Sequence, residues 1–182
     1  MKPVDIIYRI TTGSKKMRTI LTPVGLCVFF GMLVLLILAS QWLDKKLELP
    51  PLLPGPTGVL IGGVLIILGL IVWIWCVVWF LKAKGTPVPF NPPEELVNTG
   101  PYAWIRNPML SGVFATLFGF GFLQNSISMV FIWTPAFILF NIIELKLIEE
   151  PELERRFGKS YLDYMKRVPM FIPRIKSRSS QK

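Results

Sequence analysis

The sequence predicts an all-α integral membrane protein with about four transmembrane helices, on three observations. Of its 182 residues, 52% are hydrophobic and only 17% are charged, and the mean hydropathy is +0.54. The apolar residues are gathered in runs comparable to the ~20 residues that cross a bilayer as a helix. The segments between these runs carry most of the basic residues, as is typical of linkers that face anionic lipid. This composition argues against a disordered chain and against an ordinary water-soluble globule.

Four segments are apolar enough to be spans, and the third of them is short. Residues 109–123 cover only about 22 Å at 1.5 Å per residue, so we expect this helix to begin below the membrane surface, in a recess lined by protein. Residues 124–126 join it directly to the next segment, which predicts an antiparallel hairpin. The four predicted spans are residues 20–40, 58–81, 109–123 and 127–148.

The distribution of Lys and Arg predicts the orientation in the membrane. Of these 20 residues, only Lys45 and Lys46 fall on one side of the predicted spans. By the positive-inside rule, both termini and the central loop are then cytoplasmic. We therefore expect one integral membrane domain over residues 1–182, with a folded, proline-rich loop at 82–108, a C-terminal cytoplasmic segment with short helices at 149–173, and a disordered tail at 174–182.

Histidine is absent from the chain, and only two cysteines, Cys27 and Cys76, are present. The sequence thus offers no histidine general base, no histidine-based triad and no typical zinc or non-haem iron site, and we predict no metal site. Both cysteines lie within apolar runs, and we interpret them as small buried apolar residues.

Carboxylates near the end of the fourth predicted span are the first candidates for chemistry. Glu149 and Glu150 would lie at the negative end of the helix macrodipole, so either an arginine or a positively charged ligand must offset them. Glu144 lies deeper, where an ionisable residue indicates function unless it pairs with Lys146 or snorkels to the interface. The candidate protein partners of the acidic pair are Arg106, Arg155 and Arg156.

The start of the third span is a candidate anion site. Arg106 and Asn107 immediately precede Pro108, so a guanidinium group and the first free N–H groups of the helix meet at the recess. Tyr102 and Trp104 place aromatic rings beside them. The alternative is that Arg106 only anchors the helix start at the membrane interface.

Together these residues suit a ligand that carries both an anionic and a cationic group. S-adenosylmethionine has these features: its carboxylate suits Arg106 or the helix N–H groups, and its positive groups suit Glu149, Glu150 and aromatic rings. Methyl transfer from a sulfonium depends on in-line placement of the acceptor more than on a protein nucleophile. The absence of histidine is then no obstacle.

A series of motifs runs in order through the second half of the chain. They are Leu96-Val97, Gly100-Pro101-Tyr102-Ala103-Trp104-Ile105-Arg106-Asn107-Pro108-Met109 with Gly112, Glu149-Glu150, Phe157-Gly158, Tyr161, Tyr164 and Lys166-Arg167-Val168-Pro169. In order and spacing this half resembles the membrane methyltransferase superfamily that includes isoprenylcysteine carboxyl methyltransferases and phospholipid N-methyltransferases. The first half contains no motif that we can align with that superfamily.

The resemblance implies that the loop and the C-terminal segment close over S-adenosylmethionine, and that a lipid-like acceptor enters sideways from the bilayer. It also implies a role for Arg167 in placing the acceptor or its carboxylate. The cofactor-binding residues that we predict are Leu96, Val97, Gly100, Tyr102, Arg106, Asn107, Pro108, Glu149, Glu150, Tyr161 and Tyr164.

Two positions depart from the carboxyl methyltransferase pattern. Asn107 stands where those enzymes usually have histidine, and Leu110 stands where a tyrosine is common. Asn107 and the Glu149-Glu150-Pro151 run look more like the phospholipid and bacterial branches. These departures weaken any transfer of substrate identity from the carboxyl methyltransferases.

The sequence does not decide between two chemical classes of methyl acceptor, a carboxylate and an amine. A carboxylate needs a nearby cation such as Arg167, whereas an amine must lose a proton, which Glu144, Glu149 or Glu150 can assist. We therefore name Arg167, Glu150 and Glu144 as the candidate catalytic residues. Two other functions remain: an NADPH-dependent membrane lipid or steroid reductase, which would need longer cofactor loops, and a non-catalytic lipid-binding membrane protein.

Overall fold

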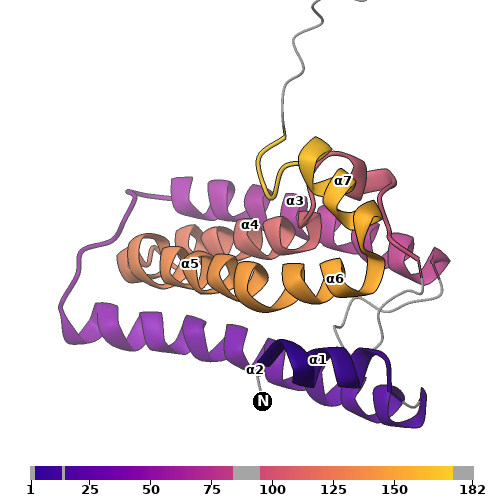
Figure 1. Cartoon of the computed structure of the whole chain (residues 1–182). Helices are drawn as coiled ribbons and strands as arrows, with labels where there is room; N and C mark the ends of the chain where they lie inside the picture. The colour runs from indigo at the N-terminus through magenta and orange to yellow at the C-terminus, as the bar shows by residue number, and fades with distance from the viewer. Residues whose placement is uncertain (1–2, 14, 84–94, 174–182) are drawn as a thin grey trace, which may run out of the picture.

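The computed structural model describes residues 3–13, 15–83 and 95–173, and every regular element in these ranges is helical (Figure 1). The predicted disordered tail at 174–182 and much of the predicted loop at 82–108 lie outside the described residues. The elements are α1 (Pro3–Thr11), α2 (Lys15–Lys46), α3 (Thr57–Lys82), the 3-10 turn η1 (Gly100–Ala103), α4 (Pro108–Leu123), the π turn η2 (Met129–Trp133), α5 (Thr134–Glu144), the π turn η3 (Leu145–Glu149), α6 (Glu150–Phe157) and α7 (Lys159–Arg167).

Three helical segments are long and apolar enough to cross a membrane: Ile20–Lys46, Thr57–Lys82 and Met129–Phe157. The apolar helix α4 is shorter, with 16 residues, as the sequence predicts. The structure therefore confirms an all-α membrane protein. Its first span continues past residue 40 to Lys46, whose ammonium group lies 4.7 Å from the centre of the Trp42 ring. A Trp and a Lys at a helix end suit the membrane–water interface, where each buries its apolar part.

The last membrane helix also runs past its predicted end at residue 148, without a break, to Phe157. Glu149 and Glu150 therefore lie inside a continuous helical segment, and the expectation that they stand at its negative C-terminal end does not hold. Pro151 is accommodated by the π turn that precedes it. A second correction concerns Cys27, which is exposed on α2, while Cys76 is buried as expected. A helix face turned towards lipid accepts a small apolar side chain as readily as a core does.

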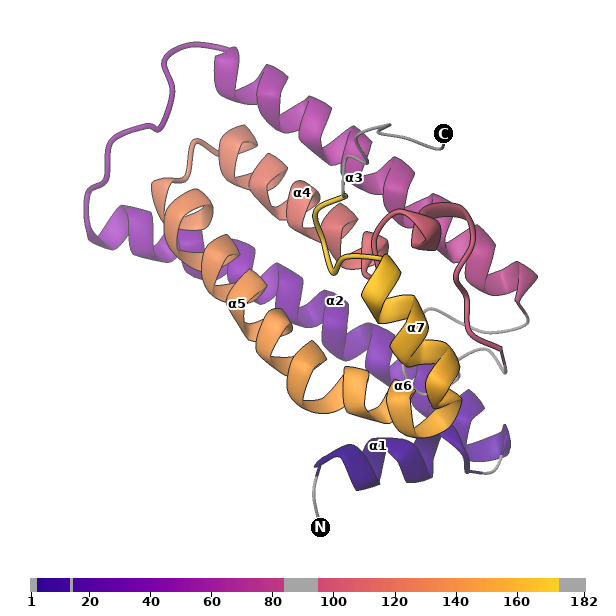
Figure 2. The same cartoon turned by 45° about the horizontal axis from the view of Figure 1, so that its top comes forward.

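Glycines bring α3 and α4 into backbone contact, and both views show the two helices side by side (Figure 2). A Cβ atom on Gly62 would lie 2.5 Å from the carbonyl oxygen of Gly119, and one on Gly69 would lie 2.5 Å from that of Gly112. Only glycine permits so close an approach of two helices. This pair forms a rigid frame that fixes the start of α4.

The core lies between α4 and α5, against which α2 and the C-terminal segment pack. Its buried side chains are Val113, Phe114, Leu117, Met129 and Phe137. Phe29 and Met32 of α2 and Phe171 of the C-terminal segment pack against this cluster from outside.

The turn between α4 and the last membrane helix confirms the predicted hairpin and is closed by polar groups. The Asp44 carboxylate at the end of α2 accepts hydrogen bonds from the Ser126 hydroxyl and, at 2.9 Å, from the Ser128 N–H. The Ser128 hydroxyl donates to the carbonyl of Ser40 at 3.0 Å. Asp44 thus caps the N-terminus of a neighbouring helix, where backbone N–H groups have no partner within their own helix.

Candidate functional site

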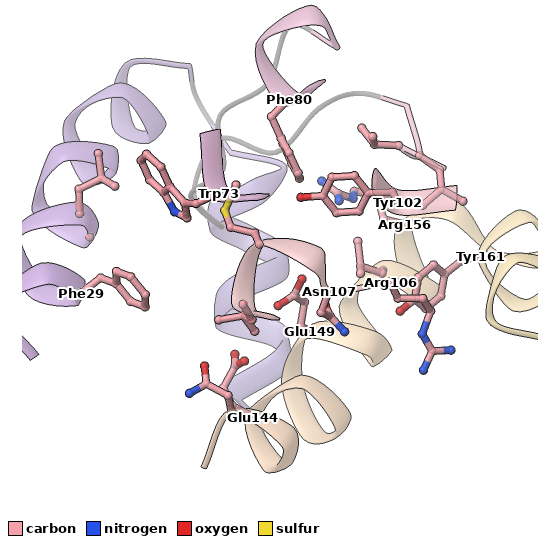
Figure 3. A pocket seen from close by; sticks show the side chains of 18 of the residues that line it. Phe29, Trp73, Phe80, Tyr102, Arg106, Asn107, Glu144, Glu149, Arg156 and Tyr161 are labelled. Atoms are coloured by element: carbon pink, nitrogen blue, oxygen red, sulfur yellow. The ribbon is translucent and has the colours of Figure 1, made fainter. Parts of the chain in front are cut away.

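A cavity of about 480 Å³ lies at the opposite end of the bundle from this hairpin, where α4 begins (Figure 3). Its walls come from α2, α3, the segment before η1, η1, the start of α4, α5, η3, α6 and α7. Helices that are far apart in the sequence, from α2 to α7, thus surround one cavity. The charged or amide-bearing residues on its wall are Glu95, Arg106, Asn107, Asn141, Glu144, Glu149 and Arg156.

The Arg106 side chain links the start of α4 to α6 and α7. Its Nη2 atom lies 2.7 Å from the Glu150 Oε1 atom, and its Nη1 group donates to the carbonyl of Met165 at 3.4 Å. Both members of the ion pair are largely buried, with side-chain exposures of 13% and 16%. Arg106 is therefore the cation that offsets Glu150, one of the two alternatives that the sequence leaves open.

Backbone hydrogen bonds fasten the C-terminal segment to the same point. The N–H of Arg106 donates to the carbonyl of Pro169 at 2.8 Å, and the N–H of Asn107 donates to the carbonyl of Met170 at 3.1 Å. These two N–H groups precede the first turn of α4, and both are used within the protein. The guanidinium of Arg106 and the side chain of Asn107 still line the cavity.

Three buried tyrosines, Tyr102, Tyr161 and Tyr164, line the cavity near Arg106. The Tyr164 hydroxyl donates to the carbonyl of Tyr102 at 2.7 Å, which joins α7 to η1. Tyr161, 3% exposed, lines the cavity with both of them. Burial raises the pKa of all three phenols above the ordinary value, so they stay protonated and neutral at physiological pH.

Glu144 and Glu149 both line the cavity, and Figure 3 shows them among its wall side chains. Among the residues that the structure describes, Glu150 pairs with Arg106 and Glu152 with Arg156, at 3.6 Å, but neither Glu144 nor Glu149 forms an ion pair. The cavity therefore presents two carboxyl groups that form no ion pair within the described part of the chain.

The structure brings most of the predicted site residues to one cavity. Those on its wall are Leu96, Val97, Tyr102, Arg106, Asn107, Glu144, Glu149, Tyr161 and Tyr164. Gly100, Pro108, Glu150 and Arg167 are not on it. Each of them has another place in the structure.

Gly100 and Pro108 shape the backbone that carries the site. Gly100 has a φ of +60°, and a Cβ atom there would lie 2.2 Å from the Trp79 ring. Pro108 is buried in the first turn of α4, where its missing N–H costs nothing. Glu150 acts through its ion pair with Arg106.

Arg167 lies away from the cavity. It is exposed at the end of α7, and its Nε group donates to the carbonyl of Asp163 at 3.2 Å, within the same helix. The structure thus does not bring Arg167 together with the other predicted site residues.

Sequence reasoning missed the wall that α2 and α3 contribute and, on α5, identified only Glu144. Asn141 lines the cavity one turn before Glu144, while its Nδ2 group donates to the carbonyl of Phe137 at 2.7 Å. A polar residue three positions from a buried carboxylate was a usable signal, because such residues share a helix face. The apolar wall residues Phe29 and Trp73 gave none, since their helices are apolar on all sides.

Comparison with known proteins extends the likeness from the second half of the chain, where the motifs lie, back to the start of α3. The model of the phospholipid methyltransferase family matches residues 57–160, which run from α3 into α7 and leave α2 outside. The chain is also 31% identical over 136 residues to the nickel-cobalt-cadmium resistance protein NccN of Alcaligenes xylosoxydans xylosoxydans. That alignment covers 75% of this chain and 56% of NccN. In the described part of the chain, no three His, Cys, Asp or Glu side chains are grouped closely enough to hold a metal ion.

Proposed function

We propose that this chain, which belongs to the phospholipid methyltransferase family, transfers a methyl group from S-adenosylmethionine to the amine of a membrane lipid. One observation carries the proposal: a single cavity joins the charged groups at the start of α4 to apolar side chains of three membrane helices. Its volume of about 480 Å³ is typical of small-molecule sites. Such a space suits a polar methyl donor and the head of a lipid whose chains stay among the helices.

The residues at the polar end fit the donor. S-adenosylmethionine supplies an electrophilic methyl group on a cationic sulfur and also carries a carboxylate and an ammonium group. Arg106 and Asn107 offer donors for a carboxylate, and Glu149 offers a carboxyl group that forms no ion pair with a protein cation among the described residues. The neutral phenols of Tyr102 and Tyr161 exclude water on this side and present aromatic faces to a cation.

The lining favours an amine over a carboxylate as the acceptor. A carboxylate acceptor needs a cation, but the predicted one, Arg167, is exposed away from the cavity, and Arg156, which lines it, is paired with Glu152. Glu144 lines the same cavity as Asn141 and the apolar side chains of α2. A carboxylate in this position attracts an ammonium headgroup and accepts one of its protons, which frees the nitrogen lone pair that then forms the new bond to the methyl carbon as the bond from that carbon to sulfur breaks.

We place the cavity at the cytoplasmic surface, with both termini on that side. The support is the charge distribution, since the segments around the cavity end carry almost all Lys and Arg residues of the chain. The substrate would then be a lipid of the inner leaflet.

The test is methyl transfer by the purified protein from labelled S-adenosylmethionine into a total lipid extract. We expect the label in an amine-bearing lipid, in a form stable to mild base. A base-labile methyl ester would instead identify a carboxylate acceptor. Binding of NADPH without binding of S-adenosylhomocysteine would overturn the methyltransferase assignment in favour of a reductase.

A further inference from the structure

Both π turns of the last membrane helix are centred on the residue four positions before a proline. The turn η2 is centred on Phe131, four residues before Pro135, and η3 is centred on Leu147, four residues before Pro151. A proline inside an α-helix has no N–H for the carbonyl four residues earlier, and its ring clashes with that carbonyl. A π turn relieves the clash by placing one extra residue in the turn. Because the same relation occurs twice in one helix, we attribute each turn to its proline.

The second π turn decides which way Glu149 faces. Glu144 precedes η3 and Glu149 ends it, so the two residues are five apart. In a regular α-helix, residues five apart point about 140° away from each other. In a π turn the i→i+5 hydrogen bond spans roughly one full turn, so the same two residues share a face. Both side chains indeed line the cavity.

We propose that Pro151 is a positioning residue, which maintains the π turn η3 and thereby holds the Glu149 carboxylate in the cavity beside Glu144. Pro151 itself is not on the cavity wall. The statement that Glu149 binds the methyl donor rests on the proposed function. The statement that Pro151 sets the orientation of the Glu149 side chain is independent of that function.

The first variant is Pro151→Ala, which permits the segment to relax into a regular α-helix. Glu149 would then turn away from Glu144, and the affinity for S-adenosylhomocysteine should fall by about tenfold or more, since small misplacements in a site are costly. The matched control is Pro135→Ala, which removes the other proline from a π turn whose residues do not line the cavity. It should leave this affinity within about twofold of the wild-type value.

The second variant combines Pro151→Ala with deletion of Lys146, an exposed residue inside η3. The deletion leaves Glu144 and Glu149 four residues apart, which in a regular α-helix places them within about 40° of each other. We expect it to restore most of the affinity that Pro151→Ala loses. If Pro151 acts in any other way, the deletion should make the defect worse, and the proposal would be wrong.

A direct readout does not depend on methyl transfer. Glu149→Cys in a Cys27→Ser background permits labelling at position 149 with a charged thiol reagent, because Cys76 is buried. Adding Pro151→Ala should change the labelling rate by about fivefold or more, and the Lys146 deletion should reverse the change. Equal rates with and without Pro151 would overturn the inference. So would failure of both Pro151 variants to fold while Pro135→Ala folds, because Pro151 would then be a folding residue.

If wild-type protein does not bind S-adenosylhomocysteine, the proposed function fails, but the labelling rates still decide the role of Pro151.

Discussion

Polar side chains gather at both ends of the helix bundle, but the two ends pair them differently. At the hairpin end the Asp44 carboxylate accepts hydrogen bonds from Ser126 and Ser128 and so caps the neighbouring helix. At the cavity end Glu144 and Glu149 face an open space and, within the described part of the chain, form no ion pair. Polar groups that the protein satisfies contribute to its stability, whereas groups left for a ligand lower stability and contribute to binding. We call the hairpin end the structural end and, on the basis of the proposed function, the cavity end the functional end.

We expect the largest effect from a change in the packed pair α3 and α4, because this pair supports both ends of the bundle. Gly62→Ala would place a Cβ atom 2.5 Å from the Gly119 oxygen and 2.6 Å from the Leu123 nitrogen, so α3 and α4 must move apart. We expect a loss of about 3 kcal/mol in the free energy of unfolding, together with loss of methyl transfer. Gly63→Ala is the control, because its Cβ atom would meet nothing within 4 Å. Equal stability of the two variants in a denaturant titration would refute the close packing.

Glu149→Gln replaces a carboxyl group with an amide at the functional end alone. We expect methyl transfer to fall by about 100-fold, because the carboxylate that faces the donor is lost, while the melting temperature stays the same or rises. The control is Glu154→Gln, an exposed carboxylate on the next helical turn. A large drop in melting temperature without a specific loss of activity would assign Glu149 to the structure instead.

Asp44→Asn should do the reverse at the structural end. Loss of the charged cap should reduce the free energy of unfolding by about 1–2 kcal/mol. The rate of methyl transfer per folded molecule should stay unchanged, since Asp44 is not on the cavity wall. Glu48→Gln, at an exposed position beyond the end of α2, serves as the control. An activity defect larger than the stability defect would break the distinction between the two ends.

Tyr164→Phe is expected to have the smallest effect. It tests whether a side chain on the cavity wall stabilises the fold or binds the ligand. It removes one hydrogen bond, 2.7 Å long, to the carbonyl of Tyr102 and leaves the ring in place. The cost should be about 1 kcal/mol in stability, with a severalfold weaker affinity for S-adenosylhomocysteine, because α7 is then less firmly held over the cavity. A loss of binding above 100-fold would show that this hydroxyl contacts the ligand directly.

Hydropathy and loop length predict most of the fold. The second and third spans agree with α3 and α4 to within a residue, and the turn at 124–126 forms the expected hairpin. The last helix differs because Pro151 after two acidic residues looks like a helix boundary. A π turn absorbs the proline instead, and no hydropathy pattern distinguishes that outcome from a break.

Motif spacing predicts most of the cavity-wall residues that come from the second half of the chain. It does not predict which of them bind each other and which face the cavity. Glu149 and Glu150 are equivalent in the sequence, yet Glu150 pairs with Arg106 while Glu149 lines the cavity. Which one faces the cavity depends on the rotation of the helix, which the π turn sets. The sequence also does not predict that α2 contributes to the cavity wall. Phe29 belongs to an apolar run in which lipid-facing and cavity-facing residues look alike.

The most direct test of the account is an experimental structure of the protein with S-adenosylhomocysteine bound. We expect the ligand in the cavity between Arg106 and Glu149, with Glu144 left on the acceptor side. Density for the ligand at any other place, with Glu149 turned towards a protein cation, would contradict the assignment of this end of the bundle to methyl transfer.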